Sequence, residues 1–540
     1  MIKSEFRSVL GENVFRFKYA QGPADTWAQV AERLVEDVCG TRWGTQPSLM
    51  SKEDRHDLVN AIKTFKFVPG GRYIYYAGRP NHYYNNCYLL RAEEDTREEW
   101  ASLAQRATSC LMTGGGIGVD YSRLRGRGKP IRKTGGVSSG PLSLMYMQNE
   151  IGRNVMQGGS RRSAIYASLN HQHEDIDLFL ESKNWSYTIK KLKSEDFNFP
   201  APLDMTNISV NYDDEWLKNP LSEVFLKNCR QAMQTGEPGF SFNFGDKQNE
   251  TLRNACTEVT SEDDSDVCNL GSINIGNIES LEEFKSIVRI ASQFLVCGTL
   301  RADLPYEKVY KVREKNRRLG LGLMGIHEWL LKKGYDYEVT PELHTWLEAY
   351  ETISKSAADE HCDRFYLSHP AAYRAIAPTG TIGILAGTTT GIEPLFAVAY
   401  KRRYLKNGDK WHYEYCVDAT AEMLVRDGVN PDKIQTAYGL SNNYERRLKF
   451  QYDVQQYVDM SISSTINLPE WGSKNNNESK VQEFAEVLAK YAPGLRGFTC
   501  YPDGSRGGQP LTEVPYSEAI KHKGIVYEEN NQCKDGVCGI

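Results

Sequence analysis

The sequence lacks any apolar run that could cross a membrane, and it lacks the common short motifs for metals and nucleotides. No stretch approaches the roughly 18 apolar residues that a transmembrane helix needs. The N-terminus MIKSEFRSVL has no apolar core of a signal peptide. HExxH and paired C-x-x-C motifs are missing, as are the Walker P-loop and the Rossmann fingerprint. We therefore expect a cytoplasmic protein with no bound metal, which is neither a P-loop NTPase nor a nicotinamide dehydrogenase.

A strong excess of one charge is also missing. The chain has 65 Lys and Arg residues against 70 Asp and Glu residues, a net charge of −5. This balance argues against a dedicated nucleic-acid-binding protein. The 540 residues exceed the usual size of a single core, so we expect one large core with appendages or two to three domains.

Three regions follow one another along the chain. Residues 1–65 are predicted to be helical, because Trp27, Val30, Leu34 and Val38 recur at helical spacing. Residues 66–505 alternate short strand-like runs, such as NNCYLL, MTNISV and STINLP, with helical segments such as VQEFAEVLAKY. This alternation favours an α/β fold with much parallel sheet, either doubly wound or closed as a barrel. Residues 506–540 are polar and irregular, which predicts a flexible tail.

Four glycine-rich stretches interrupt the central region, at residues 68–73, 113–128, 157–163 and 377–383. Each combines glycines with hydroxyl or arginine side chains, so each could hold a phosphate. A tight turn is the alternative for any one of them, but four such stretches in one chain favour phosphate binding.

The 12 cysteines include one in a conspicuous polar setting. Cys256 lies two residues from both Asn254 and Glu258, and in an extended segment these three side chains would share one face. Cys268 follows closely and could cycle between dithiol and disulfide. These residue types indicate redox chemistry on a phosphorylated substrate.

Two further groups of cysteines have distinct surroundings. Cys39, Cys297 and Cys362 lie in helix-like apolar patterns and are predicted to fill the core. Cys533 and Cys538 lie in the tail, where a dithiol with a redox purpose is favoured over half of a zinc site.

At the level of whole motifs, the chain resembles the catalytic subunit of a ribonucleotide reductase. NACTE resembles the family's N-x-C-x-E loop, and NNCYLL and CNLGSIN resemble the two strands that carry its redox cysteines. GGVSSGPLSLM, QGGSRRSA and APTGTIG are most similar to the adenosylcobalamin-dependent (class II) members. The resemblance implies a ten-stranded α/β barrel of the ribonucleotide reductase and glycyl-radical type, with a small N-terminal helical region.

The resemblance also implies a role for each motif residue. Cys256 would carry the thiyl radical, Glu258 would act as general base, and Asn254 would hydrogen-bond the ribose. Cys87 and Cys268 would reduce the substrate, and the tail pair Cys533 and Cys538 would be reduced in turn by thioredoxin or glutaredoxin. The substrate would contact Gly71, Arg72, Tyr73, Asn86, Gly116, Pro378, Thr379, Gly380, Thr381 and Ile382. A dNTP specificity effector would contact Arg123, Arg125, Gln157, Arg161 and Arg162.

The source of the radical stays open at this point. Class II enzymes use adenosylcobalamin, whereas class I enzymes receive the radical from a separate metal-containing subunit through a pair of tyrosines. Cys500 and Tyr501 stand at the matching place, so the pair is incomplete, which favours adenosylcobalamin. The terminal C-x4-C also resembles class I chains. A homodimer, diphosphate or triphosphate substrates, and a non-catalytic nucleotide-binding protein remain as further alternatives.

Overall fold

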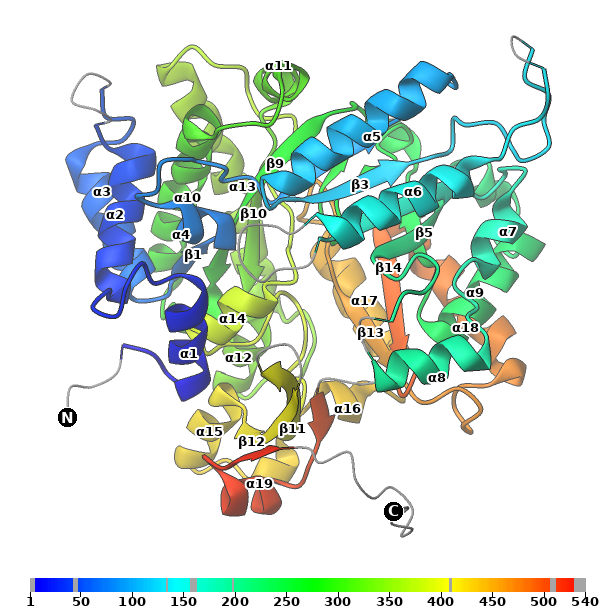
Figure 1. Ribbon diagram of the computed structural model, residues 1–540. Coiled ribbons are helices and arrows are strands. Elements are labelled where there is room, and N and C mark those ends of the chain that lie inside the picture. The colour runs from blue at the N-terminus through cyan, green and yellow to red at the C-terminus, as the bar shows by residue number, and fades with distance from the viewer. Residues whose placement is uncertain are drawn as a thin grey trace.

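The computed structural model describes residues 5–41, 47–132, 135–155, 163–196, 199–406, 410–505 and 511–528. Figure 1 shows strands in the middle of the molecule with helices around them. Ten strands form the main sheet. They are β1 (Phe67–Pro69), β2 (Cys87–Arg91), β3 (Gly116–Asp120), β4 (Ile165–Asn170), β5 (Thr206–Tyr212), β6 (Gly239–Phe242), β9 (Asp266–Asn274), β10 (Leu319–Met324), β13 (Thr465–Leu468) and β14 (Gly497–Pro502).

The sheet consists of parallel runs joined by antiparallel pairs. Strands β2 to β6 are parallel neighbours, and so are β9 with β10 and β13 with β14. Antiparallel pairs join β2 to β9 and β6 to β14. Isolated bridges from Leu321 to Arg374 and from Ile376 to Ile462 continue from β10 toward the residues before β13. The predicted ten-stranded α/β architecture is confirmed.

Helices cover this sheet because most connections between parallel strands need a crossover. Thr96 caps α5, one of these helices, through the amide of Glu99. The helices of this region are α4 (Gly71–Tyr76), α5 (Arg97–Met112), α6 (Pro141–Asn154), α7 (Ile176–Glu181), α8 (Tyr187–Glu195), α9 (Glu223–Thr235), α10 (Leu281–Arg301), α11 (Glu307–Asn316), α12 (Ile326–Lys332), α13 (Pro341–Arg364), α14 (Gly380–Ala386), α16 (Ala437–Leu440), α17 (Tyr444–Gln455) and α18 (Val481–Tyr491). None of the helices in the described ranges is long and apolar enough to span a membrane.

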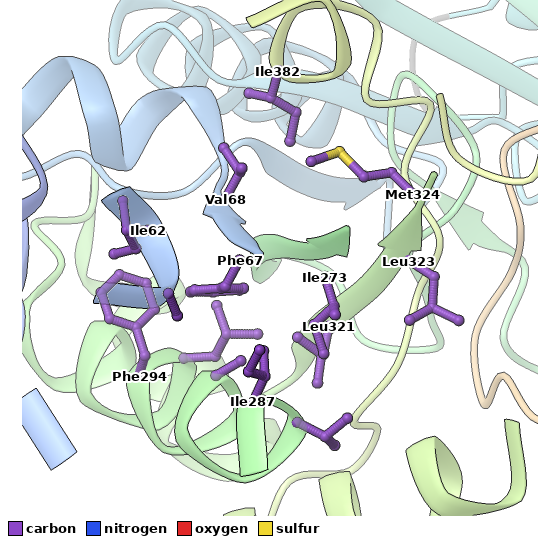
Figure 2. Packing of buried hydrophobic residues seen from close by; sticks show 14 of the residues in the cluster. Ile62, Phe67, Val68, Ile273, Ile287, Phe294, Leu321, Leu323, Met324 and Ile382 are labelled. Atoms are coloured by element: carbon purple, nitrogen blue, oxygen red, sulfur yellow. The ribbon is translucent and has the colours of Figure 1, made fainter. Parts of the chain in front are cut away.

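The N-terminal region is helical, as predicted, with α1 (Val9–Lys18), α2 (Trp27–Cys39) and α3 (Lys52–Lys63). Thr26 and Gln29 form a capping box at the start of α2. Helices α2 and α3 pack on α10 (Figure 1). Figure 2 shows part of the apolar cluster in which these helices take part, and in it Phe67 and Phe294 meet edge to face. This packing ties the N-terminal helices to β1 and β9.

Part of the segment that the sequence predicted as a flexible tail is folded. Strands β15 (Leu511–Glu513) and β16 (Val526–Glu528) flank the hairpin of β11 (Ala399–Lys406) and β12 (Lys410–Val417), and α19 (Tyr516–His522) lies between them in sequence. An antiparallel hairpin leaves two open edges, and short β-branched and aromatic runs can pair there. This small sheet, with α15 (Ala419–Arg426) after it, holds the chain just before the tail cysteines.

Candidate active site

A short loop between β7 (Leu252–Arg253) and β8 (Thr260–Ser261) carries Asn254, Cys256 and Glu258. The two strands pair antiparallel, and β7 lies against β2 and β3. Gly118 on β3 permits this approach, because an added Cβ would lie 1.7 Å from the carbonyl oxygen of Arg253. The loop is therefore held against the barrel wall by its backbone.

The loop is a turn, so the prediction of an extended segment was wrong. Thr257 has a φ of 72°, and its amide donates to the carbonyl oxygen of Asn254 at 3.0 Å. The Asn254 side-chain oxygen accepts from the amide of Val259 at 2.9 Å. A turn reverses the chain within four residues, so it brings Asn254, Cys256 and Glu258 to one cavity by a different route.

Most of the other predicted substrate residues line the same cavity. The lining includes Gly71, Asn86, Cys87, Gly116, Pro378, Thr379, Gly380, Thr381 and Ile382. Arg72 and Tyr73 do not line it, and both are buried. The reason is that α4 starts at Gly71, so its next side chains turn into the packed layer. Only the backbone at the start of this helix faces the cavity.

Glu258 has an unusual environment. It is 1% exposed, and one carboxylate oxygen, Oε2, has no hydrogen-bond partner among the described residues. Burial raises the pKa of Glu258 to about 7, although a hydrogen bond with Asn254 opposes the shift. A carboxyl group with this pKa can both accept and release a proton near neutral pH.

Cys87 and Cys268 form a cross-strand pair at the edge of the cavity. They are directly opposite each other on antiparallel β2 and β9. Directly opposed Cβ atoms lie about 4.5–5.5 Å apart, and a disulfide needs about 3.5–4.5 Å, so a small shift suffices. Burial raises the pKa of both thiols, and the charge of Glu258 adds to the shift. Both thiols therefore hold their protons at neutral pH.

Asn254 connects the loop to this pair. Its side-chain nitrogen donates to the sulfur of Cys87 at 3.0 Å. The amide therefore lies between the cysteine strand and the carboxylate, within reach of a substrate hydroxyl in the cavity.

The glycine-rich stretch at residues 377–383 begins α14. Thr379 has a φ of 49°, and its hydroxyl accepts from the amide of Gly391 at 2.8 Å. An added Cβ at Gly380 would meet no atom within 4 Å, so the space beside it is open. The first amides of a helix have no partner within the helix. An anionic group in the cavity can therefore approach this backbone.

A second and larger cavity, of about 1390 Å³, lies beside the predicted effector loop. Arg125 lines it, but its guanidinium is paired with Asp95 at 2.5 Å. Arg123 is not among the lining residues. Gln157, Arg161 and Arg162 lie outside the described residues, as do Cys533 and Cys538.

One cavity residue was not predicted from the sequence. Tyr19, just after α1, lines the cavity, and its hydroxyl would lie 2.8 Å from a Cβ added at Gly71. Its segment, FKYA, matches no motif. The N-terminal region is therefore part of the cavity wall and not only a packing module.

Comparison with known proteins agrees with this geometry. A family model described as the barrel domain of ribonucleotide reductase matches residues 85–201, 207–363 and 369–501. The chain belongs to the ribonucleotide reductase family. Family membership makes it an enzyme that reduces ribonucleotides, as its motifs predicted.

Three relatives show how far the similarity to ribonucleotide reductases extends. The chain is 27% identical to the vitamin B12-dependent ribonucleoside-diphosphate reductase of Mycobacterium tuberculosis, over 91% of this chain and 78% of the relative. It is 25% identical to the protein of the same name from Thermoplasma acidophilum, over 84% and 65% of the two chains. Identity to the ribonucleoside-diphosphate reductase large chain of Schizosaccharomyces pombe is 22%, over 57% and 45%.

Proposed function

We propose that the chain reduces ribonucleotides to 2′-deoxyribonucleotides for DNA synthesis by radical chemistry at Cys256. One observation carries the proposal. Asn254, Cys256, Glu258 and Cys87 converge on one cavity, and Cys268 stands directly opposite Cys87. In this proposal Cys256 carries the radical, Glu258 accepts a proton, and the Cys87 and Cys268 pair supplies two electrons to a substrate in the cavity.

In the proposed reaction the cavity residues act at the 3′ and 2′ positions of the ribose. The Cys256 radical takes the 3′-hydrogen of the ribose, and Glu258 accepts the proton of the 3′-hydroxyl. The 2′-hydroxyl leaves as water after it takes a proton from the Cys87 and Cys268 pair. The pair supplies two electrons and closes a disulfide, so one ribonucleotide and two thiols give one deoxyribonucleotide, one disulfide and one water. Cys256 recovers its radical when the 3′-hydrogen returns.

The substrate phosphates are proposed to bind at residues 378–382, beside the open space at Gly380. The tail cysteines Cys533 and Cys538 are proposed to reopen the disulfide by exchange and to be reduced by thioredoxin or glutaredoxin. The cavity of about 1390 Å³ at Arg125 is proposed to take a dNTP effector, because it is large enough for a nucleotide.

Adenosylcobalamin is the proposed source of the radical. Small residues form the cavity wall near Cys256, since Gly116, Ala164 and Ala255 carry nothing beyond a methyl group there. An added Cβ at Gly116 would lie 3.0 Å from that of Ala255, so the wall has no room for a larger residue. When bound, the cofactor supplies one-electron chemistry through its cobalt–carbon bond. The vitamin B12-dependent relatives support the same assignment.

The residue at the place of a radical-transfer tyrosine supports a local radical source. Cys500 is 3% exposed, and its thiol donates to the carbonyl oxygen of Ala232 on α9. Burial raises its pKa to about 12. The side chain of Cys500 thus points toward α9 and does not line the cavity, so it is not positioned to pass a radical to Cys256.

The test is reconstitution with purified chain, adenosylcobalamin, a small dithiol, and diphosphate or triphosphate substrate. We expect deoxynucleotide without a second protein. If the chain makes product only with a separately encoded metal-containing subunit, the cofactor assignment fails and the roles at the cavity stand. If neither source of radical gives product, the catalytic proposal fails as well.

A further inference from the structure

A second pair of thiols lies outside the cavity and has no part in the proposed reaction. Cys39 ends α2 and Cys297 lies in α10, and neither side chain is exposed. Helix α2 packs on α10, and the two thiols are close enough to shift each other's pKa. The sequence predicted that both fill the core, and their burial agrees, but only the packing of α2 on α10 brings them together.

A histidine completes this cluster. His361 on α13 places its ring nitrogen Nε2 3.4 Å from the sulfur of Cys297. Its other ring nitrogen, Nδ1, is buried and has no hydrogen-bond partner among the described residues. An imidazole this close to a thiol can accept its proton. Polar side chains in an apolar core normally have a hydrogen-bond partner, and here that partner is the Cys297 thiol.

The two thiols differ in character. Burial alone raises the pKa of the Cys297 thiol, but hydrogen bonds with Cys39 and then His361 outweigh it and lower this pKa below its usual value. Burial, with the neighbouring Cys297, raises the pKa of Cys39. One thiol is therefore nucleophilic and the other keeps its proton, as in pairs that react with an oxidant in two steps.

We propose that Cys39 and Cys297 are a redox modification site, which a small peroxide converts to a disulfide. The Cys297 thiolate attacks one peroxide oxygen, the O–O bond breaks, and Cys297 becomes a sulfenic acid while water leaves. Cys39 then attacks the sulfenic sulfur, the S–S bond forms and a second water leaves. Two thiols and one hydrogen peroxide thus give one disulfide and two waters. A small oxidant is required because neither thiol is exposed.

The site is connected to the catalytic strand through Tyr73. A Cβ added at Gly298, the residue after Cys297, would lie 1.7 Å from the Tyr73 hydroxyl, so this hydroxyl contacts α10 directly. The same hydroxyl accepts from the side-chain nitrogen of Asn269 at 2.5 Å, and Asn269 follows Cys268. A disulfide holds its sulfurs about 2.05 Å apart, closer than a hydrogen bond, so oxidation draws α10 toward α2. If the proposed function holds, this shift slows turnover by moving the Cys268 strand.

Peptide mapping tests the proposal without any need for turnover. The whole chain is treated with graded hydrogen peroxide, the peroxide is removed, free thiols are blocked, and the protein is digested for mass spectrometry. Met112, which is 67% exposed, serves as an internal measure of the dose. We expect a cross-linked peptide pair that contains Cys39 and Cys297, appears before Met112 is fully oxidised, and disappears on reduction.

Matched variants separate the site from general oxidation. Cys297→Ala should abolish the cross-link, and His361→Asn should slow its formation. Cys110→Ala is the control, since Cys110 is equally buried but lies on α5, outside this cluster. The control should leave the cross-link unchanged. Recovery of Cys39 and Cys297 as blocked thiols in the wild-type protein, after Met112 is oxidised, would overturn the proposal.

Turnover provides a separate readout. After the same peroxide dose, Cys39→Ala should retain more activity than the wild-type chain. A cross-link without this difference leaves the site standing and removes its connection to Cys268. An inactive wild-type chain before oxidation would count against the proposed function alone, because the mapping does not depend on it.

Discussion

Two pairs of thiols in the described part of the chain, one on strands and one on helices, have different surroundings. Cys87 and Cys268 lie on paired strands beside an open cavity, whereas Cys39 and Cys297 lie on packed helices with no exposed surface. Both thiols of the strand pair hold their protons, while the helix pair contains one thiol of lowered pKa. Access, and not only thiol reactivity, therefore decides which pair can serve a nucleotide and which can meet only a small oxidant.

The largest expected effect is at Cys256, the thiol on the cavity loop between β7 and β8. Cys256→Ser should abolish deoxynucleotide formation with every reductant, because the serine O–H bond is too strong for the radical to form. Folding and nucleotide binding should be unchanged. Turnover assays with a small dithiol, with Cys110→Ser as the matched control, check this. Product formation at the wild-type rate would remove Cys256 from its role.

The next effect concerns how the strand pair is regenerated. The double variant Cys533→Ser and Cys538→Ser should lose multiple turnover with thioredoxin but keep it with a small dithiol. A small dithiol can enter the cavity, whereas a protein cannot and so needs the tail. Steady-state assays with both reductants check this. Equal loss with the two reductants would give the tail another role.

Glu258 should make the cavity sensitive to pH. Because burial raises the pKa of folded Glu258 to about 7 from 4.5, the folded protein loses stability as pH rises between these values. Glu258→Gln should remove this dependence, which amounts to about 3 kcal/mol. As a base the residue must be ionised, so wild-type kcat should rise through pH 7.

Two measurements check the role of Glu258. Denaturant unfolding from pH 4 to 8 should give a falling free energy for the wild-type chain and a flatter one for Glu258→Gln. Turnover of the variant should fall by roughly 10²–10⁴-fold. An unchanged slope of stability with pH would contradict the buried carboxyl, and near-normal turnover would contradict the base.

The smallest effect tests the contact between the two thiol pairs. Tyr73→Phe removes the hydroxyl that accepts from Asn269 and should cost about 1 kcal/mol of unfolding free energy. Asn269 keeps its second hydrogen bond, to the carbonyl oxygen of Leu295, so the strand stays in place. The variant should also show a smaller loss of turnover after peroxide than the wild-type chain. An equal loss in both would mean that Tyr73 does not connect the pairs.

Much of the fold and of the site chemistry could be predicted from local sequence. The strand-like runs at β2, β5 and β13, the capped helix α2, and the Asn254, Cys256 and Glu258 spacing all depend on residues close in the chain. Hydrophobic periodicity and motif spacing are local properties, so they are visible without a structure.

Contacts between residues far apart in the chain became visible only in the folded structure. Tyr19 lies in the cavity wall, whereas Arg72 and Tyr73 are buried away from the cavity. Strands β15 and β16 pair with the open edges of β11 and β12. The fold also brought together Cys39, Cys297 and His361 from three separate helices, although the sequence had marked only the two cysteines, as core residues. Such contacts form because large apolar faces pack together, and the polar atoms they carry inward are a consequence of packing that no short stretch of sequence records.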